Sequence, residues 1–165
     1  MSRTHADRRP DGPIRDIEIR TASEHDLDGL RSVYRRASLS NASDRDVLLA
    51  NPQYLEFDGS ALGRGTTTLA TVGGTIVGFV TVTHDDPDDP EVDDLFVDPD
   101  WQRHGIGRLL MRSAVTTARA QGHRVLAVTG TPHAEAFYRS VGFVKIGEAA
   151  TEFAVAPRFR LMLDN

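Results

Sequence analysis

The chain has 165 residues, of which 39% are hydrophobic, and it contains no cysteine. This length fits one compact domain with a core large enough to fold without covalent cross-links. The absence of cysteine excludes disulfides, thiolate metal sites and a cysteine nucleophile. The 19 basic and 24 acidic residues give a net charge of −5, which argues against nucleic acid as a direct substrate.

The charges are unevenly distributed along the sequence. Seven of the ten residues from Asp85 to Asp94, hereafter the acidic segment, are acidic and none is basic. The residues from Trp101 to Arg124 then contain five arginines and no acidic residue. Such an asymmetry carries information about binding partners rather than about the fold.

The N-terminal residues are polar and contain Pro10 and Pro13, which favours a disordered leader over residues 1–13, followed by a single domain over residues 14–165. The sequence has no apolar run long enough for a transmembrane helix or a signal peptide. We therefore expect no membrane association and a cytoplasmic protein.

The first third of the domain begins with a strand and two helices. Residues 17–20 alternate as a short strand, and Ser23 with Asp26 matches a capping box at the start of a helix. A second short helix is predicted over residues 44–49 and ends before Pro52. Residues 53–65 show no clear periodicity.

The rest of the domain alternates between strands and helices. Residues 67–83 form a predicted hairpin around a Gly-Gly turn, and a strand over residues 92–97 precedes a helix that runs from Ile106 to Gly122. Further strands are expected over residues 124–129, 143–146 and 159–163, and a helix over residues 134–141. This order predicts an α/β (α+β) fold with a mixed central sheet of about six to seven strands and four helices.

One segment carries a recognisable chemical pattern, the sequence Gln102-x-x-Gly105-x-Gly107 between a strand and a helix. A glycine-bearing turn at a helix N-terminus presents backbone N–H groups at the positive end of the helix dipole, which suits a pyrophosphate. Arg103 and His104 add positive charge beside this turn. The pattern matches neither a dinucleotide fingerprint nor a Walker loop.

The same segment closely resembles the Q/R-x-x-G-x-G/A signature of the GCN5-related N-acetyltransferases, the GNAT superfamily. The preceding Leu95-x-Val97-x-Pro99 is similar to the splayed strand of that family, and the stretch from Phe137 to Phe143 is similar to its helix-to-strand corner. The resemblance covers residues 17–163 and implies the GNAT fold.

The resemblance implies an acetyl-CoA-dependent N-acetyltransferase without a metal, which moves the acetyl group directly to a primary amine of a small molecule or a protein. Thr131 stands where many members carry asparagine. The cofactor-binding positions that the resemblance implies are Leu95, Phe96, Val97, Gln102, Arg103, His104, Gly105, Ile106, Gly107, Arg108, Thr131 and Tyr138. One alternative interpretation is a non-catalytic acyl-CoA-binding sensor or regulatory module, and another is an interaction protein whose acidic loop docks a basic partner.

Two catalytic roles follow from the resemblance. Tyr138 matches the tyrosine that donates a proton to the departing thiolate, and a phenol is protonated at neutral pH. Glu91 is the first candidate for the base that takes the proton of the amine, with Asp93, Asp94 or water as alternatives. The scattered histidines show no metal-ligand spacing, so no metal site is expected.

The acidic segment adjoins the strand that would carry the acyl group. We therefore hypothesise that it attracts a cationic acceptor, whereas a solvated loop that protects a strand edge is the alternative. The resemblance also leaves a homodimer possible.

Overall fold

The computed structural model describes residues 16–64, 66–151 and 155–164, so the predicted leader over residues 1–13 lies outside the described residues. The strands are β1 (Ile17–Thr21), β2 (Thr67–Val72), β3 (Thr75–Thr83), β4 (Glu91–Val97), β5 (Val125–Thr129), β6 (Val144–Ala150) and β7 (Val155–Met162). The α-helices are α1 (Leu27–Leu39), α2 (Ala42–Ala50), α3 (Ile106–Ala120) and α4 (Glu135–Ser140).

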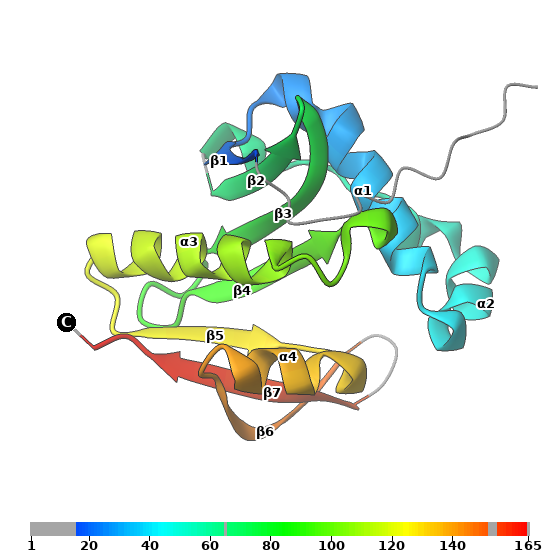
Figure 1. Cartoon of the computed structure of the whole chain (residues 1–165). Helices are drawn as coiled ribbons and strands as arrows, with labels where there is room; N and C mark the ends of the chain where they lie inside the picture. Colours follow the sequence, from blue (N-terminus) through cyan, green and yellow to red (C-terminus); the bar gives the residue numbers. More distant parts are fainter. Residues whose placement is uncertain (1–15, 65, 152–154, 165) are drawn as a thin grey trace, which may run out of the picture.

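The seven strands form one mixed sheet in the order β1-β2-β3-β4-β5-β7-β6 (Figure 1). All neighbouring strands are antiparallel except β4 and β5, which are parallel. The predicted fold class, a mixed sheet of six to seven strands with four helices, is confirmed.

The last two strands are longer than the sequence predicts. The strand expected over residues 143–146 continues to Ala150, and the strand expected from Phe159 begins at Val155. The two strands pair from Val144↔Arg160 to Ala150↔Val155. Because β6 is an edge strand whose side chains are mostly exposed, its sequence lacks the apolar alternation that would reveal its full length.

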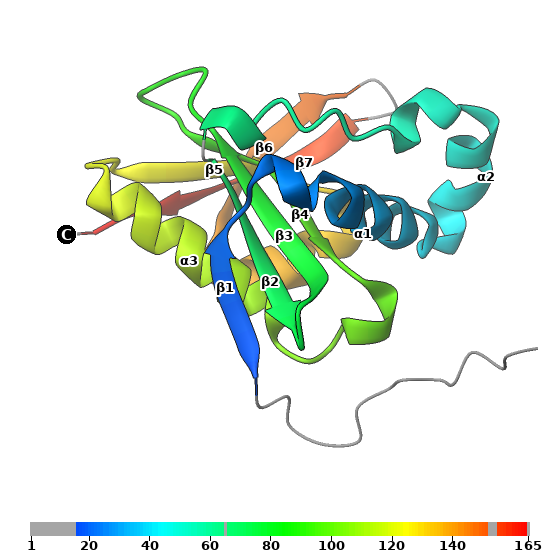
Figure 2. The same cartoon turned by 90° about the horizontal axis from the view of Figure 1, so that it is seen from above.

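Helices cover both faces of the sheet (Figure 2). Phe79 of β3 packs with Leu30 of α1, whereas its neighbour Val80 belongs to a second cluster with Leu110 of α3. Adjacent strand residues point to opposite faces, so α1 and α3 lie on opposite sides of the sheet. None of the described helices is both long and apolar enough to cross a membrane.

The predicted capping box is present, and it starts a 3-10 turn, Glu24–Asp26, that leads directly into α1. The Asp26 carboxylate accepts a hydrogen bond from the backbone N–H of Ser23 at 2.8 Å and from the Arg20 guanidinium at 2.8 Å. These bonds hold the pKa of Asp26 below its ordinary value, with the Arg20 bond as the largest cause. The capping box therefore also ties α1 to β1.

The sheet is forked at its centre. The pairing of β4 with β5 consists of Glu91↔Ala127 and Val92↔Val128. Beyond Val92, the residues of β4 remain paired with β3 up to Gly78↔Val97, while no strand pairs with their other edge among the described residues. The fork therefore leaves backbone groups of β4 free beside the N-terminus of α3.

Candidate active site

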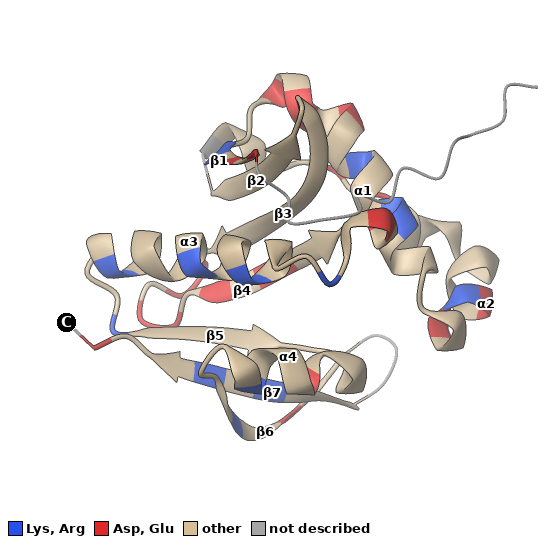
Figure 3. Cartoon of the chain, in the orientation of Figure 1, with Lys and Arg blue, Asp and Glu red and all other residues tan. Residues whose placement is uncertain are grey.

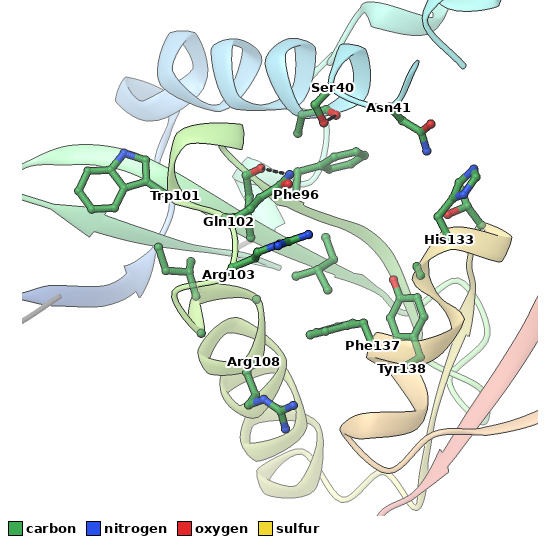
Figure 4. A pocket seen from close by; sticks show the side chains of 18 residues that line it. Ser40, Asn41, Phe96, Trp101, Gln102, Arg103, Arg108, His133, Phe137 and Tyr138 are labelled. Carbon is green, nitrogen blue, oxygen red and sulfur yellow. Dashed lines mark hydrogen bonds between the residues drawn. The ribbon is translucent and has the colours of Figure 1, made fainter. Parts of the chain in front are cut away.

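A cleft of about 800 Å³ lies at this fork (Figure 4). Its walls come from residues 95–97 of β4, the N-terminus of α3, the start of α4 and the junction between α1 and α2. Every residue that the sequence predicts to bind the cofactor lines this cleft, except His104. The predicted residues that line it are Leu95, Phe96, Val97, Gln102, Arg103, Gly105, Ile106, Gly107, Arg108, Thr131 and Tyr138.

The N-terminus of α3 offers the cleft a set of unpaired donors. Gly105 is the N-cap residue, with a left-handed φ of 79° and no side-chain cap. The first helical bond runs from Leu109 N to Gly105 O at 3.1 Å, so the N–H groups of residues 106–108 have no acceptor within the helix. Because the first turn contains no acidic residue, this helix end suits an anion.

The side chains around this helix end shape the turn. Gln102 Nε2 donates to the carbonyl oxygen of Val97 at 3.3 Å, which ties the loop back to β4. Arg103 adopts a φ of 66°, a left-handed conformation that is uncommon for a residue with a side chain. Arg108 donates to Ser140 Oγ at 3.1 Å and thereby links α3 with α4. Arg103 and Arg108 bring two positive charges to the cleft wall.

Tyr138 lies at the other side of the cleft, and its hydroxyl points into the space between the walls (Figure 4). Its ring is 7% exposed and packs against Phe137, Phe143 and Phe159 with centroid distances of 5.4 to 5.7 Å. Burial raises the pKa of Tyr138 to about 12. The phenol is therefore protonated at neutral pH and is able to donate.

The two carboxylates of β4 that matter for proton transfer have different surroundings. Glu91 Oε1 accepts from Arg158 at 3.0 Å and from Thr129 at 3.2 Å. Neither Glu91 nor Asp94 lines the cleft, and Asp94 lines a second cavity on the same strand. Burial raises the pKa of Asp94 to about 6, with the negative charge of Asp93 as the next cause. Glu91 is thus held in an ion pair, whereas Asp94 is poised to exchange a proton near neutral pH.

A second cavity of about 360 Å³ is lined by residues of β3 and β4 and by Tyr34 of α1. The aromatic rings of Tyr34 and Phe57, 5.7 Å apart, form part of its wall. No lysine, arginine or histidine lines it, but four carboxylates do: Glu56, Asp58, Asp93 and Asp94. This cavity therefore has strongly negative walls and adjoins the same strand as the cleft.

The acidic segment forms the loop between β3 and β4 and the start of β4 (Figure 3), and some of its carboxylates are held in ion pairs. Asp89 pairs with Arg158 at 3.1 Å and with Arg160 at 3.4 Å, and Glu91 pairs with Arg158. Three other members, Asp85, Asp86 and Asp88, are exposed. The arginines of β7 thus hold the end of the segment that enters β4, and the exposed carboxylates lie farther out.

A family model described as an acetyltransferase (GNAT) domain matches residues 53–156 of the chain. The chain belongs to this GNAT family. The family assignment made from Gln102, Gly105 and Gly107 is confirmed, and the predicted enzyme class, N-acetyltransferase, is the class of this family.

Individual relatives agree with the family. The chain is 38% identical over 81 residues to the N-alpha-acetyltransferase RimI of Mycobacterium tuberculosis, a match that covers 47% of this chain and 51% of the relative. The matching part thus spans about half the length of that relative.

Solved structures share the fold. A PaiA N-acetyltransferase from Thermoplasma acidophilum in complex with coenzyme A has a TM-score of 0.74 at 18% identity, and the superposition covers 90% of this chain and 99% of that one. The ribosomal-protein-S18-alanine N-acetyltransferase from Escherichia coli has a TM-score of 0.67 at 19% identity, and the superposition covers 91% of this chain and 96% of that one. Identities this low establish the fold alone.

Some cleft residues carry no signal in the sequence. Asn41 belongs to the α1–α2 junction and lies opposite His133 (Figure 4). Ser43 of α2 bridges the two, because its Oγ lies 2.7 Å from Asn41 Oδ1 and 3.2 Å from His133 Nε2. This contact joins positions 90 residues apart, so only the folded chain reveals that it links two walls of the cleft.

The left-handed glycine at the cleft gives a first testable prediction. We expect Gly105→Ala to weaken acetyl-CoA binding and to cost about 1 kcal/mol of stability, because an L side chain disfavours this φ. Gly122→Ala is a matched control, since Gly122 has a φ of 83° and open space at its Cβ position, as Gly105 does, but lies at the far end of α3. Melting and titration should show a similar loss of Tm in both variants and weaker binding in Gly105→Ala alone; equal binding losses would contradict the prediction.

Proposed function

We propose that this GNAT chain transfers the acetyl group of acetyl-CoA to a primary amine. The observation that carries the proposal is the cleft at the fork of β4 and β5, where the N-terminus of α3, Tyr138 and the end of β4 line one space. A regulatory module that only binds acyl-CoA would need the anion site but not a buried, protonated phenol in the same cleft.

The residues of the cleft fit the chemistry of acetyl-CoA. The N–H groups of residues 106–108, with Arg103 and Arg108, suit its pyrophosphate. The cofactor supplies an acetyl thioester when bound. Backbone N–H groups around Phe96 and Val97 would donate to an acyl carbonyl, and Thr131 lines the same cleft and is a candidate contact for the pantetheine arm.

Two residues with raised pKa values, Tyr138 and Asp94, are proposed to transfer protons, one as the acid and the other as the base. Tyr138, whose pKa is raised to about 12, remains protonated and donates a proton to the leaving sulfur. Asp94, whose pKa is raised to about 6, is mostly ionised at pH 7 and accepts the proton that the amine loses. We therefore propose Asp94 in place of Glu91 as the base, because Glu91 is engaged by Arg158.

The second cavity supports a cationic acceptor. Its four carboxylates and the rings of Tyr34 and Phe57 together favour an ammonium group, through charge and through cation–π attraction. One ammonium group would balance only one of these four carboxylates. We therefore propose that the acceptor carries a further cationic group besides the amine that reacts. The homodimer and the cytoplasmic location stay predictions.

An amine panel tests the proposal. Thiol release from acetyl-CoA is measured with aliphatic monoamines, with diamines of the same length and with short peptides that have a free α-amine. We expect turnover, with a higher kcat/KM for diamines than for monoamines, and we expect Glu56→Gln to raise the KM of the diamines selectively. Binding of acetyl-CoA without turnover of any amine would instead support the regulatory module.

A further inference from the structure

Arg36 of α1 contacts the loop that leads from β4 into the anion site. Its Nη2 lies 2.9 Å from Asp100 Oδ2 and 3.4 Å from Asp98 Oδ1. The basic end of α1 and the acidic start of this loop lie side by side (Figure 3). One arginine on the α1 side of the sheet thus engages both carboxylates of a loop that belongs to the cofactor side.

The two carboxylates present an electrostatic problem for an anion site. Asp98 and Asp100 precede Gly105 by only a few residues, and the resulting negative charge opposes a bound pyrophosphate. Asp98 is 9% exposed, and its Oδ1 accepts the backbone N–H of Asp100 at 2.9 Å, so this carboxylate is built into the turn. Arg36 supplies a compensating positive charge.

The loop also needs a mechanical anchor. Arg103 holds a left-handed φ of 66°, a conformation that persists only where its surroundings impose it. The start of the loop is fixed by Asp98, whose N–H donates to Val77 O and whose carbonyl accepts from Trp101 N, both at 2.8 Å. Arg36 adds a tie from this fixed start to α1, the helix whose Ala37 and following residues form the opposite wall of the cleft.

We infer that Arg36 is a positioning residue for the acetyl-CoA site: it offsets part of the negative charge of Asp98 and Asp100 and holds their loop against α1. The inference rests on the proposed function because the ligand is acetyl-CoA. Arg36 does not line the cleft, so its effect reaches the ligand through the loop. Loss of Arg36 should therefore raise the Kd and the KM for acetyl-CoA and leave kcat nearly unchanged.

Calorimetric titration of acetyl-CoA into the full chain tests this inference. We expect Arg36→Gln to weaken binding about three- to tenfold at low salt, because the loop loses one positive charge and its two carboxylates then repel a bound anion more strongly. The difference from wild type should shrink at high salt because salt screens this repulsion. The double variant Arg36→Gln, Asp100→Asn should recover much of the affinity, since it removes one of the unpaired charges.

Arg35→Gln is the matched control, because Arg35 is an exposed arginine at the neighbouring position of the same helix. Unchanged affinity in Arg36→Gln, an equal loss in Arg35→Gln, or a loss that Asp100→Asn does not relieve would each overturn the inference. Failure of the proposed function appears separately, as a wild-type chain that binds acetyl-CoA but acetylates no amine.

Discussion

Replacing Tyr138 by phenylalanine should lower kcat by about a hundredfold, the scale of a lost general acid, while the Kd for acetyl-CoA stays the same. The phenylalanine ring preserves the packing on Phe137, Phe143 and Phe159, so only the hydroxyl that faces the cleft is lost. Steady-state kinetics with saturating amine, together with calorimetric titration of acetyl-CoA, measures both quantities.

The pH dependence provides a second readout for Tyr138. Its pKa of about 12 keeps the phenol protonated across the usual assay range, so wild type should show no loss of rate from this group up to pH 9.

Tyr54→Phe serves as a control for Tyr138→Phe, because Tyr54 is also a tyrosine but lines neither cavity. Wild-type kcat in Tyr138→Phe would remove the acid role and leave Tyr138 as a packing residue.

The fold was largely predictable from local patterns. The capping box of Ser23 and Asp26, the Gly-Gly hairpin and the apolar period of α3 each arise from neighbouring residues, and each is present in the structure. The extent of β6 was not predictable, because an edge strand with exposed side chains has no buried face to impose a pattern. The 3-10 turns Pro52–Leu55 and Leu62–Arg64, within the stretch that showed no periodicity, also carry no signal of their own.

The candidate site divides in the same way. The predicted cofactor residues fall in two short segments, residues 95–108 and 131–138, whose motifs name them without knowledge of the fold. The resemblance put Glu91 first as the base, with Asp93, Asp94 or water as alternatives, because the sequence does not show what surrounds each of these carboxylates. Our proposal of Asp94 in place of Glu91 rests on Arg158, which lies 67 positions after Glu91 and contacts it only in the folded chain.

Asp94→Asn should therefore reduce kcat/KM by about a hundredfold and remove the acidic limb of the pH–rate profile. In wild type the rate should rise as the pH passes about 6, because only the ionised carboxylate accepts a proton. Asparagine has the same shape but has no titration in this range. Any remaining rise at higher pH would then belong to the amine acceptor itself.

The thermal stability of the Asp94→Asn variant distinguishes a catalytic role of Asp94 from a structural one. The pKa of Asp94 is raised from 3.8 to about 6, so the folded state binds the proton more tightly than the unfolded state, and the free energy of unfolding decreases as the pH rises through this window. Asp94→Asn should therefore have a higher Tm than wild type at pH 7 despite its low activity. Glu91→Gln should have a lower Tm than wild type, because it breaks the contact with Arg158. It should keep its activity, because the proposed base Asp94 is still in place. If Glu91→Gln abolished turnover and Asp94→Asn kept the acidic limb, the base would be Glu91.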